Sequence, residues 1–362
     1  MRALYRSMSI LAWTATGRLT SIVRALAMRR EGGNLRPILG LIAALPLCNW
    51  AVADSAQPDV AAVRLHLVKA RALAGGDLYT TYVQRCITTQ AYPNLVNDLQ
   101  RKAPLPATRV FDQLYFVGQN DVSAWALDTS EGIILFDALN GPDEVTGTIV
   151  PGMKTLGLDP TRIRYIVLTH AHGDHYGGVN EVKALTKAHV ISTEADWQEL
   201  DRQRTQPARQ GMPAAWAKLA PERDMTVREG DTLKLGATTL HFYVTPGHTP
   251  GTLTTMFDVT DGKTPHRVAL YGGLGLPRTA EALRQYSASL DRFAEIAGAQ
   301  KVDTVIANHQ TQDDSRVKIE ELRWRAAGEP HPYVLGLTVT PRFFQVQAEC
   351  GRAALGRMGL AE

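Results

Sequence analysis

Cysteine is scarce in this chain, which limits how the protein can be stabilised. The 362 residues include three cysteines, at positions 48, 86 and 350, too few for a small scaffold held together by several disulfides. Neither Cys86 nor Cys350 belongs to a C-x-x-C pair. In an oxidising compartment these two could form one bridge, and in a reducing one they would be buried thiols. The sequence leaves both alternatives open.

Long hydrophobic runs and dense basic clusters are also missing. The apolar run at 37–47 is too short for a helix that spans a membrane. The formal net charge of +3 comes from residues 1–53, which contain seven arginines and one acid, so residues 54–362 alone carry −3. No run of Lys and Arg interleaved with aromatic residues stands out there. Nucleic acid is therefore not an expected partner.

Residues 1–53 have the pattern of an export signal. Arg36 precedes the apolar run, and Ala51-Val52-Ala53 follows it as an A-x-A cleavage site. We therefore expect cleavage after Ala53, a periplasmic or secreted protein and no stable membrane insertion after cleavage. Residues 1–27 are surplus to such a signal, which indicates a true start at Met28. An uncleaved anchor and a mitochondrial transit peptide are the alternatives.

The hydrophobic pattern after the leader predicts a mixed α/β protein. Residues 58–104 and 341–360 have helical periodicity, with a break predicted at Gly75-Gly76 in the first stretch. Between them lie short β-like runs, at 114–117, 123–127, 133–137, 163–170, 188–192, 232–235, 239–245, 251–259, 267–271 and 304–309. Helix-like segments separate them at 143–156, 178–187 and 280–297. Two β-rich halves with helices outside predict a four-layer αβ/βα sandwich in a single catalytic domain.

Residues 168–178 read LTHAHGDHYGG and contain four side chains that can bind a metal: His170, His172, Asp174 and His175. They follow a nearly continuous apolar strand, and active residues of α/β folds tend to lie at such carboxyl ends. Polar groups so close together are costly to bury unless something pairs them, and a cation does so. Imidazole and carboxylate are suitable zinc ligands. We predict a metal site here, with a purely structural zinc as the alternative.

Two more histidines also stand at the ends of predicted strands. A catalytic zinc generally has three protein ligands and an open position, so two zinc ions need ligands beyond the local four. His248 lies in the turn TPGHTPG after a strand, and His309 ends the apolar run TVIANH. The remaining histidines of residues 54–362 lack such settings and are predicted to be structural or exposed: His66, His189, His241, His266 and His331.

With these residues in view, the chain resembles the metallo-β-lactamase-fold hydrolases over residues 108–310. The resemblance rests on H-x-H-x-D-H at 170–175, on the two later histidines, and on SAWALDTSEGIILFDA at 123–138, which is similar to the first hairpin of that fold. It implies that His170, His172 and His248 hold a first zinc ion. It also implies that Asp174, His175 and His309 hold a second. A ligand set without cysteine is similar to that of one branch of true β-lactamases.

The resemblance also implies a division of the chain and shows one departure. Residues 54–107 would be a helical extension before the catalytic domain at 108–310, and 311–362 a helical extension packed on it. Many relatives place a metal-bridging Asp after a strand between the last two histidines, and the similar lactamases have Ser in that region. This chain has Gly272 and Gly273 there, which counts against phosphodiesterases and against lactamase-type recognition of a substrate carboxylate.

The predicted function is a zinc-dependent hydrolase with two Zn²⁺ ions per chain. A hydroxide bridging the metals would attack a small-molecule substrate at a cyclic amide, ester or thioester carbonyl, with Asp174 orienting it. A lactonase and a glyoxalase II-like thioesterase are the nearest alternatives. A mononuclear iron persulfide-type dioxygenase and a non-catalytic periplasmic zinc-binding protein are alternatives of other classes. Substrate identity and oligomeric state are not readable from the sequence.

The stretch 201–229 is one further segment that we consider as a contributor to the site. It contains Arg202, Arg204, Arg209 and Trp216. Two interpretations stand: these side chains overhang the cleft and select substrate, or the segment is a solvated surface excursion.

Overall fold

A computed structural model describes residues 57–206 and 213–360. The chain divides into two compact units, Met1–Asp54 and Ser55–Glu362, and every described element belongs to the second. The predicted leader and its cleavage site lie outside the described residues. Among the described helices, none is both long enough and apolar enough to cross a membrane.

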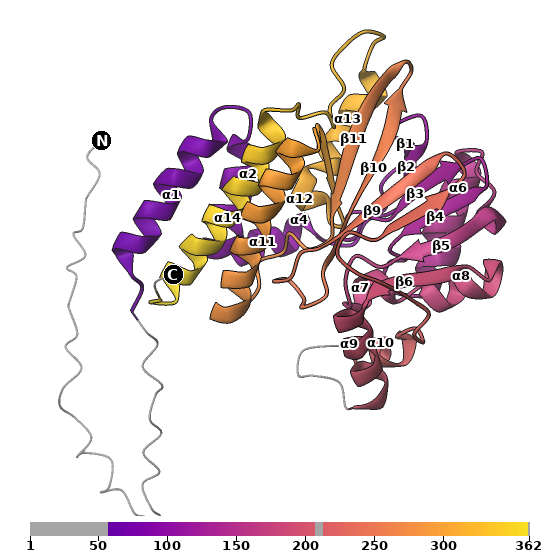
Figure 1. The fold of residues 1–362 in the computed structure, drawn as a ribbon, viewed down its shortest axis with the longest axis horizontal. Helices are drawn as coiled ribbons and strands as arrows, with labels where there is room; N and C mark the ends of the chain where they lie inside the picture. The colour runs from indigo at the N-terminus through magenta and orange to yellow at the C-terminus, as the bar shows by residue number, and fades with distance from the viewer. Residues whose placement is uncertain (1–56, 207–212, 361–362) are drawn as a thin grey trace, which may run out of the picture. The chain divides into compact units, whose positions relative to one another are not determined.

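Two β-sheets form the centre of the described unit (Figure 1). The strands of the first sheet are neighbours in chain order: β1 (Thr108–Arg109), β2 (Leu114–Phe116), β3 (Trp125–Thr129), β4 (Gly132–Phe136), β5 (Ile163–Val167), β6 (His189–Thr193) and β7 (Met225–Val227). The second sheet has the order β12-β11-β10-β9-β8: β8 (Thr232–Leu235), β9 (Thr238–Val244), β10 (Leu253–Asp261), β11 (Thr264–Tyr271) and β12 (Thr304–Ala307). Strands β4 to β7 run parallel, and β12 is parallel to β11.

Both faces of each sheet are covered, which explains the continuous apolar runs in the sequence. All five residues of β4 are buried. Large aromatic side chains fill the space between the sheets, and Phe136 of β4 stacks on Phe257 of β10 with ring centroids 5.4 Å apart. This contact joins the two halves of the molecule through one hydrophobic core.

The helices form the two outer layers. Those on the first sheet are α5 (Pro142–Glu144), η2 (Val145–Ile149), α6 (Val150–Thr155), η3 (Pro160–Arg162), α7 (Gly173–Tyr176), α8 (Val179–Thr186), α9 (Glu194–Thr205) and α10 (Ala214–Leu219). The second sheet is covered by α11 (Ala280–Ala299) and α14 (Val339–Arg357), and α1 (Val60–Ala74) packs on α14 (Figure 1). The predicted four-layer α/β architecture is confirmed.

Some boundaries differ from the sequence predictions. The helical stretch 58–104 is broken after α1, as predicted at Gly75-Gly76, but it is then divided further into α2 (Tyr79–Tyr82), a π-helical turn η1 (Val83–Thr88), α3 (Thr89–Ala91) and α4 (Pro93–Leu99). The break follows Gly75, which adopts φ 58°, a conformation that glycine reaches without steric cost. Two further helices, α12 (Gln310–Asp313) and α13 (Ser315–Trp324), lie where a helical extension was predicted from residue 311, although the sequence predicted no bounds for them.

Cys86 and Cys350 form a disulfide with a Cα–Cα distance of 4.7 Å. It joins η1 to α14 across 264 residues of chain. The structure thus decides between the two alternatives that the sequence left open. Because the bridge closes a long loop, it restricts the unfolded chain and stabilises the fold by about 2–5 kcal/mol. It ties the N-terminal helices to the last helix of the chain.

Candidate metal centre

The H-x-H-x-D-H segment begins where β5 ends. Strand β5 stops at Val167, and His170 and His172 lie in the loop before α7, which holds Asp174 and His175. The loop is tight because α7 starts at Gly173, where an added Cβ would lie 2.0 Å from the Trp216 ring. The sequence therefore folds the four side chains to one edge of the first sheet.

The first group of candidate ligands is His170, His172 and His248, whose ligand atoms lie within 4.8 Å of one another. Nε2 of His170 is 3.0 Å from Nδ1 of His172 and 3.1 Å from Nε2 of His248. Ligand atoms that hold one zinc tetrahedrally at about 2.0–2.1 Å lie roughly 3.3 Å apart. Three ring nitrogens at this spacing have the arrangement of a three-histidine zinc site.

The second group is Asp174, His175 and His309, again within 4.8 Å. Oδ2 of Asp174 lies 3.3 Å from Nε2 of His175 and 3.6 Å from Nε2 of His309. The two groups are neighbours, because the rings of His170 and His175 have centroids 4.2 Å apart. The structure therefore brings together all six side chains that the sequence singled out, in the same two sets of three.

The rings of His248 and His309 are oriented through their other nitrogen, which fixes which nitrogen faces the group. Nδ1 of His248 is 2.8 Å from the carbonyl oxygen of Gly275, and Nδ1 of His309 is 2.6 Å from that of Asp121. A carbonyl can only accept, so both Nδ1 atoms carry the proton and both Nε2 atoms have a free lone pair. Metal-binding histidines are commonly held in this way.

Asp137 orients the rest of the centre, and the sequence analysis did not identify it. Its carboxylate accepts hydrogen bonds from the amide and the hydroxyl of Thr169, both at 2.8 Å, and Nδ1 of His175 lies 2.8 Å from the same carboxylate. Nε2 of His175 is consequently turned toward Asp174, where it is buried without a hydrogen bond of good geometry. A buried ring nitrogen left in this state fits a metal ligand. The positive φ of Asp137, 60°, is a signal that only the structure reveals.

Electrostatics separate the two groups. Burial lowers the pKa of His170 and His248 well below the ordinary value, and that of His172 to about 4. These imidazoles are neutral at pH 7, which is the form that binds a metal.

In the second group, burial opposes protonation of His175, but the charges of Asp174 and Asp137 raise its pKa to about 10. For Asp174, burial acts in the raising direction, but the nearby His175 and His309 lower its pKa overall. Without a metal, this group is held together as a buried ion pair. A cation that binds here replaces the proton of His175.

Comparison with known proteins identifies the domain. Residues 117–263 match the family model described as the metallo-β-lactamase superfamily. The chain contains a metallo-β-lactamase superfamily domain. It is similar to the solved structure of BJP-1, a subclass B3 metallo-β-lactamase of Bradyrhizobium japonicum, with 28% identity and a TM-score of 0.57 over 68% of this chain and 92% of that one. A mutant of the FEZ-1 metallo-β-lactamase from Legionella gormanii shares the fold, with 21% identity and a TM-score of 0.59 over 74% and 99%.

Among curated proteins, the relatives are named hydroxyacylglutathione hydrolases. The protein from Methylobacterium nodulans is 33% identical over 134 residues, which are 35% of this chain and 43% of that protein. The protein from Methylococcus capsulatus is 24% identical over 234 residues, which are 59% and 80% of the two chains. The chain thus spans less than half the length of the first of these relatives. Relatives of the domain are hydrolases, and its His/Asp groups fit metal binding.

A buried carboxylate, Asp196 near the start of α9, connects two ligand loops of the metallo-β-lactamase domain. It accepts hydrogen bonds from the amide of Ala171 at 3.0 Å, between His170 and His172. It also accepts from the amide of Gly251 at 3.1 Å and the hydroxyl of Thr249 at 3.2 Å, directly after His248. Burial raises its pKa to about 7, against the effect of these hydrogen bonds. No sequence pattern points to Asp196, because the two loops that it connects are distant along the chain.

Gly272 and Gly273 lie against the ligand loops. A Cβ on Gly272 would be 2.2 Å from the carbonyl oxygen of Leu253, and one on Gly273 would be 2.7 Å from Cβ of His248. The corner is therefore too tight for a side chain in the present backbone position. Nδ2 of Asn308 donates to the Gly272 carbonyl at 2.6 Å and to the Thr169 hydroxyl at 2.9 Å. Backbone and amide groups occupy this side of the centre.

Two described residues of the stretch 201–229 lie beside the centre: Trp216, and Gln203, whose Nε2 donates to the carbonyl of Ala171 at 3.0 Å. Trp216 of α10 packs on Gly173 at the start of α7. Arg202 and Arg204 instead pair with Glu199 and Asp201 on their own helix, and Arg209 lies outside the described residues. The contacts of Arg202 and Arg204 fit a surface segment, and selection of substrate by this stretch stays a prediction. Four of the five other histidines make polar contacts away from the centre: His66 with Glu349, His189 with Asp224, His266 with Asp303, and His331 with the carbonyl of Val110.

Proposed function

We propose that this protein is a zinc-dependent hydrolase that binds two Zn²⁺ ions and cleaves the carbonyl–heteroatom bond of a cyclic amide, ester or thioester. The observation that carries the proposal is the pair of adjacent three-ligand groups, each with ring nitrogens turned inward by partners on the opposite nitrogen. Nitrogen and carboxylate donors in threes favour zinc with an open position for water. When bound, zinc would polarise the substrate carbonyl and lower the pKa of that water toward 7.

The protein's own groups hold and orient the reactants. Asp174 is the most accessible of the second group, with 21% of its side chain exposed against 0% for His175. Its carboxylate can therefore both contact a metal and accept a hydrogen bond from the attacking water on the open side. Asp137, which is 1% exposed, fixes His175 and Thr169 from behind. This arrangement requires no protein nucleophile.

A β-lactam is the leading substrate class. BJP-1, a subclass B3 metallo-β-lactamase, matches over 92% of its own length. The candidate ligand set contains no cysteine. The tight corner at Gly272 and Gly273 has no carboxylate side chain, which disfavours enzymes that depend on a bridging Asp. The same corner lacks the serine of similar lactamases, so a β-lactam carboxylate would have to be bound by other groups.

A thioester is the second candidate, and the sequence relatives favour it. The curated proteins that match are named hydroxyacylglutathione hydrolases, and one of them matches over 80% of its length. The two candidates differ in the leaving group, an amide nitrogen or a thiolate. The substrate class is therefore decided by a hydrolysis panel that contains both.

We also propose export to the periplasm, from the leader pattern at 37–53, which would be tested by N-terminal sequencing of the mature protein.

Metal content and hydrolysis measured on the same preparation test the proposal. We expect two zinc ions per chain and turnover of nitrocefin, a lactone or an acylglutathione. His172→Ala should lose zinc and turnover together, because it removes one of three ligands of the first group. His189→Ala is the matched control, since that imidazole is 62% exposed and pairs only with Asp224.

Three results would reject the proposal. Full turnover in His172→Ala would exclude the centre as the active site. One iron per chain with sulfur-dependent oxygen uptake would assign the domain to the dioxygenases. Two bound zinc ions without turnover on lactam, lactone, ester, thioester and phosphodiester substrates would indicate a zinc-binding protein without catalytic activity.

A further inference from the structure

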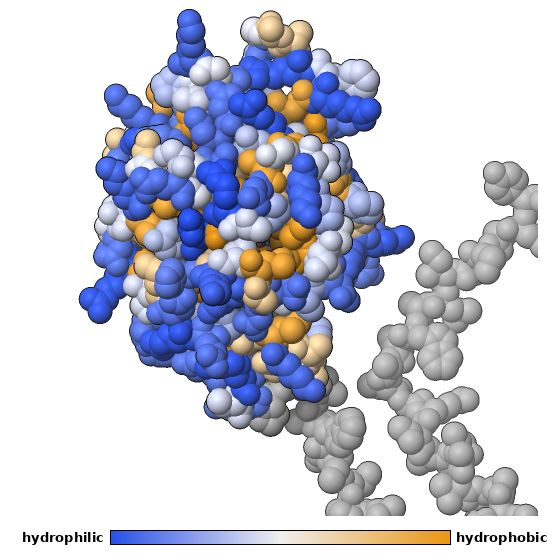
Figure 2. Space-filling view, turned by 90° about the vertical axis from the view of Figure 1, so that its right-hand side faces the viewer, coloured by the Kyte–Doolittle hydropathy of each residue, from blue (hydrophilic) through white to orange (hydrophobic). Residues whose placement is uncertain are grey.

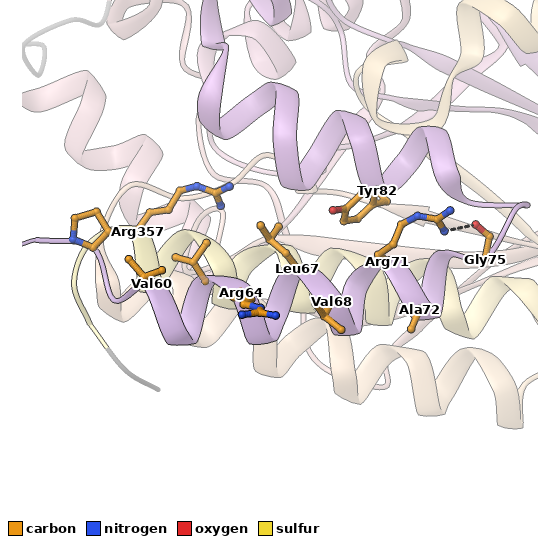
Figure 3. Close-up of a pocket in the computed structure, with 11 residues that line it drawn as sticks. Val60, Arg64, Leu67, Val68, Arg71, Ala72, Gly75, Tyr82 and Arg357 are labelled. Atoms are coloured by element: carbon orange, nitrogen blue, oxygen red, sulfur yellow. Dashed lines mark hydrogen bonds between the residues drawn. The ribbon is translucent and has the colours of Figure 1, made fainter.

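The N-terminal helices form an apolar groove far from the metal centre. It has a volume of about 980 Å³ and runs between α1 and the helical segment that carries Tyr82 (Figure 3). Val60, Leu67 and Val68 of α1 line it, and Arg357 from the end of α14 lies at the end near Val60. This volume is at the upper end of the range for ligand-binding pockets. The groove is large enough for an acyl chain.

The outer side of α1 is also apolar where it meets solvent. Val60, Leu65 and Val68 are 74%, 50% and 61% exposed. Of the twelve large hydrophobic side chains that are exposed within the described residues, six lie between residues 60 and 95. The opposite end of the molecule, over the first sheet, is mainly hydrophilic, with hydrophobic residues showing in small groups between charged ones (Figure 2). Exposed apolar surface that is concentrated in one region marks a contact site.

The same helix is basic. Helix α1 contains Arg64, Lys69 and Arg71 and no Asp or Glu. Arg71 donates to the carbonyl of Gly75, and Arg357 donates to the carbonyl of Cys86 and the side-chain oxygen of Gln90, so both guanidinium groups have neutral acceptors. Arg71 also lies over the ring of Tyr79, 4.5 Å from its centroid, so no carboxylate neutralises either group in these contacts.

The nearby acids do not offset this charge. Residues 57–104 contain six lysines and arginines but three aspartates; of the six, Arg85 is buried and Lys102 pairs with Glu144, so the exposed charge is that of α1 and Arg101. Asp59 accepts a hydrogen bond from the amide of Ala62 at the start of α1, and Asp77 and Asp98 pair with Arg342 and Arg101. Residues 54–362 as a whole carry −3, so the helical segment is basic on an acidic protein. An anionic partner is indicated for this face alone.

Charge also distinguishes among the partners that could bind the α1 face. A second copy packed through the same face would oppose arginine to arginine, and two-fold packing requires such self-contact. The leader is a poor occupant for the same reason, since residues 1–53 contain seven arginines and one acid. A bilayer with anionic headgroups presents negative charge and hydrocarbon in one plane, which matches alternating aliphatic and basic side chains on a surface helix.

We propose that the outer face of α1 and the adjoining groove form a docking site for a membrane surface rich in anionic phospholipid. Arg64, Lys69 and Arg71 contact phosphate groups, and Val60, Leu65 and Val68 enter the headgroup boundary, with an acyl chain reaching into the groove. The helix lies on the membrane and does not span it. The site does not depend on hydrolysis, so the proposed function and the docking site stand or fall separately.

Co-sedimentation of the full chain with lipid vesicles tests the site. The two vesicle types are pure phosphatidylcholine and equal parts of phosphatidylcholine and phosphatidylglycerol. We expect binding to the anionic vesicles that weakens as salt rises, and little binding to the neutral ones. Arg64→Glu combined with Val68→Glu should weaken binding roughly tenfold or more, because it reverses one charge and removes one apolar contact.

A matched control is available on α13. Arg316→Glu combined with Val317→Glu makes the same two changes at exposed positions of another surface, and we expect it to bind like the wild type. Both variants keep the leader, so any contribution from it is common to both. Circular dichroism melting checks that each variant is folded.

Several outcomes would overturn the docking site. Equal binding by the two double variants would place the lipid contact elsewhere in the chain. Equal binding to vesicles with and without phosphatidylglycerol would show that the arginines do not contact anionic headgroups. Lipid-free sedimentation that shows a dimer in the wild type and a monomer only in the α1 variant would assign the face to a second copy. A pull-down by an acidic protein without vesicle binding would assign it to a protein partner.

Discussion

The two ligand groups of the metal centre are built from similar residues but are held in different ways. In the first group, His248 is oriented by a backbone carbonyl, and burial keeps its imidazole neutral. In the second group, His175 is oriented by the carboxylate of Asp137 and faces a second carboxylate, Asp174. The first group is therefore ready for a cation, whereas the second must release a proton to accept one. The difference predicts unequal affinities for two ions in one cleft.

Substitution of single candidate ligands should have the largest effect on zinc binding, and the effect should differ between the two groups. His170→Ala should reduce zinc binding and turnover to below about 1% of wild type, because this ring contacts both His172 and His248 and adjoins His175. His309→Ala should leave one zinc ion per chain, bound by the first group. Zinc stoichiometry by mass spectrometry distinguishes the two variants. Equal stoichiometry in both would contradict the predicted difference between the two groups.

Asp137→Asn should weaken the second group selectively. The amide retains the shape of the side chain but loses the charge that holds His175 and Thr169. We expect zinc affinity of the second site to fall by about 10–100-fold, as for other residues that orient a ligand, with smaller change at the first. Stepwise removal of zinc by a chelator measures both affinities. A uniform loss at both sites would mean that Asp137 supports the whole fold instead.

The stability of the zinc-free protein should respond to pH in opposite directions through the two groups. The pKa of His175 is raised to about 10 from 6.5, so its stabilisation is complete below pH 6.5 and is lost as pH rises toward 10. The pKa of His172 is lowered to about 4, so stability is lost as pH falls from 6.5 toward 4. Thermal melting from pH 4 to 10 should show a maximum near neutrality. His175→Ala should flatten the alkaline side, and an unchanged alkaline side would contradict the assignment.

Asp196→Asn should have the smallest effect of the four. The amide can satisfy only part of the set of donors from Ala171, Thr249 and Gly251, and we expect the free energy of unfolding to fall by about 1–3 kcal/mol. Because these donors adjoin the first group, zinc affinity should fall there and not at the second site. Asp201→Asn, on the exposed side of α9, is the control. Equal destabilisation by both substitutions would remove the special position of Asp196.

The sequence predicted the ligands better than the groups that hold them. His170, His172, Asp174 and His175 occur within six positions after an apolar strand, which predicts a metal site from the pattern. The assignment of His248 and His309 to the two candidate groups came from the resemblance to the metallo-β-lactamase-fold hydrolases. Asp137 and Asp196 have no such pattern, because their function depends on contacts with Thr169 and Gly251, which are distant along the chain. The sequence predicted a layered architecture but no order of strands within the sheets. It also predicted the break of the helical stretch 58–104 at Gly75-Gly76, but not the division of the rest into α2, η1, α3 and α4.

The sequence by itself determined the two layers of β-strands, the candidate ligands and the basic character of residues 57–104, because hydrophobic period and residue chemistry are local properties. The tertiary structure alone decided that Cys86 bonds Cys350, that Asp137 and Asp196 hold the ligand loops, and that α1 keeps an apolar face in solvent. These features depend on which distant segments meet. Contacts between distant segments form because many side chains from the whole chain are buried together. No short stretch of sequence contains that information.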